Sequence, residues 1–287
     1  MPLRLRQRTF GADELAIMAI VNRTPDSFYD RGATYRLGAA LVAVDRAVSA
    51  GAAIVDIGGV KAGPGPEVDP AEERRRTVEL VAAVRSRYPE LVISVDTWRA
   101  EVARVALAEG ADLVNDTWGG PDSGLAEAAA EAGAGLVCAH AGGLAPRSRP
   151  HRVAYPDLMA DIVGTLTRLA DRALAAGVRR DGILLDPAHD FGKNTRHSLE
   201  VTRRLGELTT LGFPVLVSLS RKDFLGETLD LPVHERLEGT LAATAVCAWL
   251  GASVFRAHDV QATRRVLDTV AAIRGSRPPA VARRGLA

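Results

Sequence analysis

Eight short apolar segments rich in β-branched residues recur along the chain, and this repeat limits the possible folds more than any other feature. They occupy residues 15–22, 52–58, 91–97, 111–117, 134–140, 182–187, 214–220 and 252–259. A stretch with helical spacing follows each segment, and the near-continuous apolarity is typical of strands covered on both faces. Eight strand–helix units in about 260 residues predict a single (β/α)₈ TIM barrel.

Helix-capping residues support this interpretation and set the domain limits. Asp69 and Pro70 are typical of a helix start, and the helix they begin is expected to run to about Tyr88, before Pro89. We therefore expect one domain over residues 1–274. The segment GSRPPAVARRGLA, residues 275–287, is rich in Pro and Arg without periodicity, which predicts a disordered tail.

Charge and cysteine usage exclude several classes of partner. Lys plus Arg number 36 and Asp plus Glu number 35, a net charge of +1, so no overall field would attract nucleic acid or an anionic membrane. Cys138 and Cys247 lie in apolar runs, as expected for packing residues in a reducing compartment. The longest apolar run, residues 241–255, is too short for a membrane span, and the N-terminus lacks a signal-peptide pattern. We expect a cytoplasmic protein.

Nearly every predicted strand ends in a polar residue that an apolar strand does not need. In a barrel these ends form the face that carries active sites. The polar residues are Asn22, Asp56, Asp96, Asn115, His140, Asp186, Ser220, Arg221, Lys222, Arg256 and His258. Structural alternatives remain open at three positions: Asp56 as a turn cap, Asn115-Asp116 as an Asx-turn and His140 as a wall residue.

Two halves of a ligand site can be read from these strand ends. Arg221, Lys222, Arg256 and His258 follow the last two strands, where barrels commonly bind phosphate, so we expect a phosphorylated ligand.

The other strand ends suit a heterocycle. The oxygens of Asp96, Asn115 and Asp186 match the donors of an amino-pyrimidinone edge. No metal-binding His spacing occurs, and Mg²⁺ held by Asn22 together with ligand phosphates is the favoured metal arrangement.

Ordered motifs over residues 15–272 resemble the dihydropteroate synthase family. They are IMAIVNRTPDSFYDRG, GAAIVDIGG, ISVDTWRAEVA, GADLVNDTWGG, ILLDPAHDFGK, PVLVSLSRKDFLG and RLEGTLAATA with VFRAHDV. The resemblance implies a transferase of folate biosynthesis, in which 4-aminobenzoate displaces pyrophosphate from 6-hydroxymethyl-7,8-dihydropterin diphosphate.

The resemblance also implies residue roles. Substrate contacts are expected at Asn22, Asp96, Asn115, Asp186, Phe191, Lys222, Arg256 and His258. Of these, Lys222, Arg256 and His258 are the expected catalytic residues and Asn22 the Mg²⁺ ligand, because fixed positive charge on the departing pyrophosphate is the main catalytic requirement. A homodimer is expected, as is common in the family.

One loop departs from the family pattern. Where the family has D-I-G-G-E-S-T-R-P-G, this chain has DIGGVKAGPG, so Ala62 and Gly63 replace Thr and Arg. Lys61, Arg23 and Arg31 are candidates to compensate, although Lys lacks the planar fork of Arg. The resemblance is therefore to a divergent paralogue with weakened or lost activity. A non-catalytic pterin- or folate-binding protein and a transferase with an altered acceptor are the alternatives.

Overall fold

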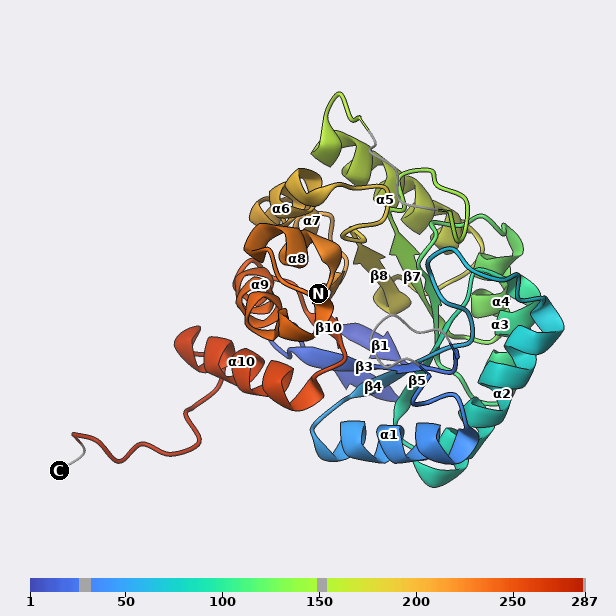
Figure 1. Ribbon diagram of the computed structural model, residues 1–287, viewed down its shortest axis with the longest axis horizontal. Coiled ribbons are helices and arrows are strands. Elements are labelled where there is room, and N and C mark those ends of the chain that lie inside the picture. The colour runs from blue at the N-terminus through green and yellow to red at the C-terminus, as the bar shows by residue number, and fades with distance from the viewer. Residues whose placement is uncertain (26–31, 149–153, 286–287) are drawn as a thin grey trace.

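The computed structural model describes residues 1–25, 32–148 and 154–285, in which eight parallel strands form a nearly closed barrel (Figure 1). The strands are β3 (Ala16–Asn22), β4 (Ile54–Gly58), β5 (Val92–Asp96), β6 (Leu113–Asp116), β7 (Gly135–Ala139), β8 (Ile183–Asp186), β9 (Leu216–Ser218) and β10 (Val254–Ala257). They pair in the order β8-β7-β6-β5-β4-β3-β10-β9, and a parallel bridge between Leu185 and Val215 joins the two ends. The predicted (β/α)₈ fold is confirmed.

Helices surround the barrel (Figure 1). They are α1 (Leu37–Ser49), α2 (Pro70–Arg87), α3 (Ala100–Ala108), α4 (Gly124–Glu131), α5 (Leu158–Ala175), α6 (Thr195–Arg203), α7 (Gly206–Thr209), α8 (Asp223–Leu229), α9 (Leu237–Trp249) and α10 (Val260–Ile273). Helix α2 begins as predicted, with the Asp69 side chain accepting a hydrogen bond from the Glu72 backbone N–H at 2.8 Å. Among the described residues, none of the helices has the length and apolarity that a membrane crossing requires.

The end of the chain differs from the barrel. After α10, residues 275–285 form neither helix nor strand, and their side chains are exposed. Figure 1 shows this segment leading away from the barrel. Disorder of residues 275–287 stays a prediction, as does the cytoplasmic location.

Strand alternation fills the N-terminal half of the barrel with apolar side chains. The inward-pointing cluster contains Met18, Ile54, Val92, Leu113, Val137, Leu184, Leu216 and Val254. A short antiparallel hairpin, β1 (Leu3–Leu5) and β2 (Arg8–Phe10), adds Leu3, Leu5 and Phe10 to the same buried cluster. The hairpin was not among the sequence-based expectations, because strands of three residues are too short to show alternation.

Polar residues take the inward positions nearer the C-terminal ends of the strands. Asp56 pairs in register with Ser94, and Asp96 with Asn115. Because inward positions recur every second residue, these side chains continue the barrel interior above the apolar cluster. The sequence therefore places a polar layer between the packed core and the mouth of the barrel.

Candidate functional site

A cavity of about 440 Å³ opens at the C-terminal ends of the strands. Seven predicted site residues line it: Asn22, Asp96, Asp186, Phe191, Lys222, Arg256 and His258. The eighth, Asn115, is not among the lining residues, because its side chain is fully buried and donates to Asp56 at 3.0 Å. The sequence-based selection thus converges on one cavity and on the polar layer beneath it.

The guanidinium of Arg256 is held by two carboxylates inside the barrel. Its Nε donates to Asp56 Oδ2 at 2.6 Å, and its Nη2 donates to Asp96 Oδ2 at 2.9 Å. Asp56 is fully buried and also accepts from Ser94 Oγ at 2.6 Å. Asp56 is therefore the centre of a buried network and not a turn cap.

Burial shifts the pKa of several groups at the cavity. It raises the pKa of Asp96 to about 7, although the positive charge of Arg256 opposes this shift. Burial likewise raises the pKa of Asp186, against the effect of Lys222. For His258, burial and then the charges of Arg256 and Arg221 lower the pKa to about 3, so its imidazole is neutral at pH 7.

The cations at the mouth are mostly committed to contacts within the protein. Arg221 Nε donates to Asp259 Oδ2 at 3.0 Å, and Arg256 is held by its two carboxylates. Lys222 donates to the backbone carbonyl of His189 and lies 5.0 Å from the ring centre of Phe191. The four predicted residues therefore come together at the cavity, but His258 is neutral at pH 7 and both arginines are paired with carboxylates.

Lys61 is the exception among the cavity-lining cations. Within residues 1–25, 32–148 and 154–285, it is the lining cation that forms neither a hydrogen bond nor an ion pair. Its half-buried side chain lies on the loop that contains Ala62 and Gly63, and all three residues line the cavity. Lys61 is therefore available to bind an anionic ligand.

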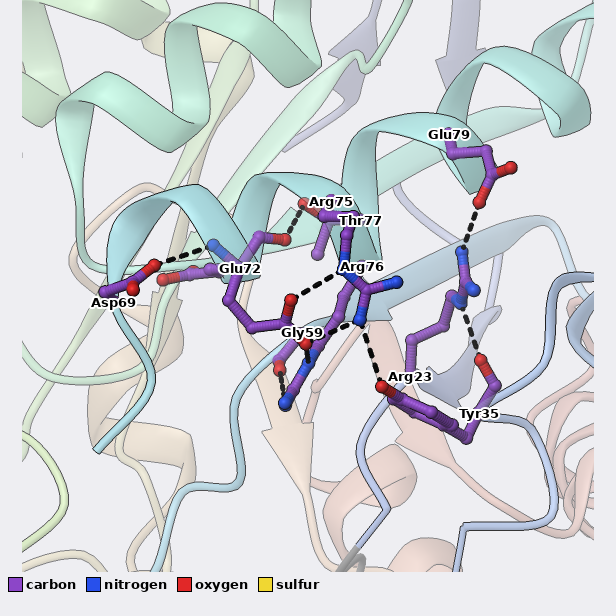
Figure 2. A network of polar contacts seen from close by, with 10 residues as sticks. Arg23, Tyr35, Gly59, Asp69, Glu72, Arg75, Arg76, Thr77 and Glu79 are labelled. Carbon is purple, nitrogen blue, oxygen red and sulfur yellow. Dashed lines mark hydrogen bonds and ion pairs between the residues drawn. The ribbon is translucent and has the colours of Figure 1, made fainter. Parts of the chain in front are cut away.

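The other candidates for compensation differ from Lys61. Arg23 is not a lining residue. Its Nη1 donates to Glu79 at 3.2 Å and its Nε to the Tyr35 carbonyl at 3.1 Å (Figure 2). Only 6% of the Arg23 side chain is exposed. Through these two hydrogen bonds, Arg23 connects Tyr35, which precedes α1, to Glu79 of α2. Arg31 lies outside the described residues.

The loop after β4, residues 59–69, is called the β4 loop. Three arginines hold it by donating hydrogen bonds to its backbone carbonyls. Arg76 donates to the Gly59 carbonyl at 3.0 Å, a contact shown in Figure 2 beside the Glu72–Arg76 ion pair. Arg147 donates to the Pro66 carbonyl at 2.6 Å. Arg99 donates to the carbonyl of Val68 at 2.8 Å. These contacts fix the path of the loop at its start and at its end.

The structure also decides two of the alternatives left open by the sequence. Asp116 accepts from the backbone N–H groups of Trp118 at 3.1 Å and Gly120 at 2.5 Å, which makes it a loop-forming residue. His140 is 1% exposed and contacts Lys193 and Asp161 instead of lining the cavity.

Two aromatic residues and one buried lysine were not identified from the sequence. Trp98 and Trp118 line the cavity, and the Trp118 ring meets Phe191 edge-on at 5.1 Å. Lys193 is 4% exposed and lies behind the cavity wall. Trp98 and Trp118 follow the polar ends of β5 and β6 by two residues, a signal that could have found them. Lys193 is seven residues beyond the end of β8 and offers no such signal.

Comparison with known proteins places this geometry in a family. The profile of the family described as "Pterin binding enzyme" matches residues 18–258. "Inactive dihydropteroate synthase 2" of Mycobacterium leprae (strain TN) is 58% identical, covering 98% of each chain. The Yersinia pestis dihydropteroate synthase solved with a sulfonamide drug complex is 36% identical, with a TM-score of 0.91 over 96% of this chain and 100% of that one. The Xanthomonas albilineans dihydropteroate synthase solved with 4-aminobenzoic acid is 34% identical, with a TM-score of 0.86 over 98% and 99%.

Proposed function

Since this chain belongs to the family of pterin-binding enzymes, we propose that it binds a pterin diphosphate at the mouth of the barrel and that its β4 loop limits synthase turnover. One observation carries the proposal. Seven of the eight residues expected to bind the substrate line one cavity, and Lys61 is the cation that the β4 loop contributes to that cavity. The name of the Mycobacterium leprae relative supports reduced activity.

The pterin half of the proposal rests on Asp186, Asp96 and Asn115. Carboxylate oxygens pair with the donors of an amino-pyrimidinone edge. The Oδ1 atom of Asn115 is buried and has no hydrogen-bond partner among the described residues. An unsatisfied buried acceptor costs about 1–3 kcal/mol, so a donor on the ligand that reached this oxygen would be favoured. Phe191 and Trp118 supply the apolar wall.

For the diphosphate half, we assign Lys61 and Asn22. No cluster of three His, Cys, Asp or Glu side chains able to hold a metal occurs among the described residues. Mg²⁺ commonly relies on substrate phosphates and waters with one or two protein oxygens. Gly58 leaves the Asn22 amide oxygen open, since a Cβ at this glycine would lie only 3.3 Å from it. Asn22 is therefore suited to hold Mg²⁺ on a bound diphosphate.

Two ligands that differ only in the diphosphate test the pterin half and the diphosphate half of the proposal separately. Lys61→Met is expected to weaken 6-hydroxymethylpterin diphosphate about tenfold and to leave 6-hydroxymethylpterin unaffected, since a hydrogen bond to a charged group contributes about 1.5–3 kcal/mol and about 1.4 kcal/mol is a factor of ten. Calorimetric titration with Mg²⁺ measures both affinities. Chelating Mg²⁺ should likewise weaken only the diphosphate.

Lys222→Met is the matched control, because Lys222 faces Asp186 and Phe191 and should affect both ligands. An equal loss of affinity for the two ligands in Lys61→Met would remove Lys61 from the anion site. Failure of the unmodified protein to bind either ligand would reject the proposed function itself.

Two other functions remain compatible with the same cavity. A pterin- or folate-binding protein without turnover would need no replacement for the missing Arg at Gly63. A transferase with an altered acceptor would need one, together with an amine other than 4-aminobenzoate. Pyrophosphate release with and without 4-aminobenzoate distinguishes these functions from weak synthase activity.

We also propose that a second copy of this chain covers the exposed apolar surface of α9 and α10. These helices pack together. Val246 and Trp249 of α9 are 46% and 59% exposed, and Ile273 of α10 is 68% exposed. Large exposed apolar side chains grouped on neighbouring elements are typical of a protein interface.

Trp249→Glu tests the dimer. It is expected to raise the dimer dissociation constant at least about 30-fold, since truncating an interface hot spot costs about 2 kcal/mol or more. Sedimentation equilibrium measures the constant. Val42→Glu is the control, because Val42 is 47% exposed but belongs to α1 and not to α9 or α10. A monomeric parent protein, or a dimer that tolerates Trp249→Glu, would contradict the proposal.

A further inference from the structure

Lys193 forms an unusually dense set of contacts behind the cavity wall. Its Nζ lies 2.8 Å from both the Nδ1 atom and the backbone carbonyl of His140. The same atom lies 3.0 Å from the Phe191 carbonyl and 3.3 Å from the Ala188 carbonyl. Phe191 and Ala188 both line the cavity. One buried amine therefore joins the loop after β7 to the loop after β8 directly behind the ligand site.

His140 extends these contacts to the protein surface. An ammonium group has donors only, so the Nδ1 atom of His140 must accept from Lys193. The remaining proton then lies on Nε2, which is 2.7 Å from Asp161 Oδ1. Asp161 belongs to α5, and 49% of its side chain is exposed. A carboxylate, an imidazole and an ammonium thus form a line from solvent to the cavity wall.

The surroundings of Lys193 shift its pKa, so that its ammonium and neutral amine forms are close in free energy near neutral pH. Burial lowers its pKa to about 7, against the carboxylates of Asp186, Asp190 and Asp161, while Lys222 lowers it further. Burial lowers the pKa of the neighbouring His140, His189 and His197, which favours the neutral form of each imidazole. The Tyr155 hydroxyl, which donates to the Gly192 carbonyl, has a pKa of about 12 because it is buried.

We propose that Lys193 is a positioning residue that holds Ala188 and Phe191 in place as the ligand-binding wall, and that Asp161, through His140, keeps it in the ammonium form that does so. The ammonium form has three N–H groups for its four acceptors, whereas the neutral amine has two and a lone pair that repels carbonyl oxygens. Loss of the proton therefore releases part of the wall. The effect on ligands rests on the proposed function, but the effect on the wall does not.

The ligand test compares two pH values. Lys193→Met is expected to weaken 6-hydroxymethylpterin diphosphate more than about fivefold near pH 6, where Lys193 is charged, and less than about twofold near pH 8.5, where it is neutral. The ratio of variant to parent affinity cancels titration of the ligand. A merely structural role would give the same loss at both pH values, and that result would overturn the proposal.

A second test needs no ligand. It follows the ¹⁹F NMR chemical shifts of protein labelled with 4-fluorophenylalanine as a function of pH. The Phe191 signal, assigned with Phe191→Leu, is expected to titrate near pH 7 in the parent protein and to lose this transition in Lys193→Met. A transition that survives in Lys193→Met belongs to another group, such as Asp190 beside Phe191, and would overturn the proposal even if the diphosphate binds.

Asp161→Asn tests the Asp161–His140–Lys193 contacts at their exposed end. Because 49% of the Asp161 side chain is exposed, we expect this variant to fold. It should lower the midpoint by about half a unit, since a negative charge that favours the ammonium is removed. Asp171→Asn, an exposed change on the same helix, should leave the midpoint unchanged. A midpoint that does not move in Asp161→Asn would show that the surface carboxylate does not support Lys193, and would overturn that part of the proposal.

Discussion

Replacing Val60–Gly63 with Glu-Ser-Thr-Arg is expected to raise 4-aminobenzoate-dependent pyrophosphate release at least tenfold. Restoring Arg places a forked cation beside the leaving group, and removal of one well-aimed charge-stabilising donor typically costs about 10²–10³ in rate. The backbone at Gly63 can carry a side chain. Among the described residues, the one atom within 4 Å of a Cβ at Gly63 is Lys61 Cε, at 3.6 Å, and the graft replaces Lys61. Gly63 is not among the residues with a positive φ.

The measurement is kcat and KM for the parent and the graft. The matched control is the graft Glu-Ser-Thr-Gly, which restores every changed position except the Arg and should recover little of the rate. A change confined to KM would indicate better ground-state binding without better charge stabilisation in the transition state. If the full graft folds and binds the diphosphate but kcat does not rise, the β4 loop does not limit turnover.

Removing the Asp56 carboxylate is expected to cause a large loss of stability. In Asp56→Ala, the Arg256 guanidinium keeps only Asp96, while Asn115 and Ser94 lose their acceptor. Breaking a buried ion pair by removing one partner typically costs about 3–5 kcal/mol, because the other charge stays buried. Urea unfolding with a fixed m-value measures the difference in free energy.

Ser94→Ala is the control for this variant. It removes one neutral donor from the same carboxylate, and a typical hydrogen bond contributes about 0.5–1.5 kcal/mol. We therefore expect Asp56→Ala to be destabilised at least twice as much. A loss in Asp56→Ala no larger than that of Ser94→Ala would mean that water or a rearranged Arg256 satisfies the network, and that Asp56 is not its centre.

The barrel could be predicted from sequence because each strand carries the information locally. Eight apolar segments and their polar ends identify the mouth, and parallel strands bring those ends to one face. The N-terminal hairpin was not predicted. Its residues Leu3, Leu5 and Phe10 become buried only by packing against barrel strands that are distant in the sequence.

The chemistry at the mouth was less predictable than its location. The sequence identifies Arg256 as a residue at the rim, but its direction is set by Asp56, 200 positions earlier in the chain. Arg221 resembles its neighbour Lys222 in sequence, yet it binds Asp259. Lys193 could be assigned only once two loops were seen to meet at its amine. Pairing partners depend on rotamers and burial, which local patterns do not contain.

The way in which Arg76, Arg99 and Arg147 hold the loop after β4 has an evolutionary consequence. All three bind carbonyl oxygens, which every amino acid possesses, so the anchors do not depend on the side chains between them. A lineage could therefore exchange Thr and Arg for Ala62 and Gly63 without displacing the main chain. The same property makes residues 60–63 a natural position for a randomised library, in which selection for new acceptors could proceed while the scaffold stays constant.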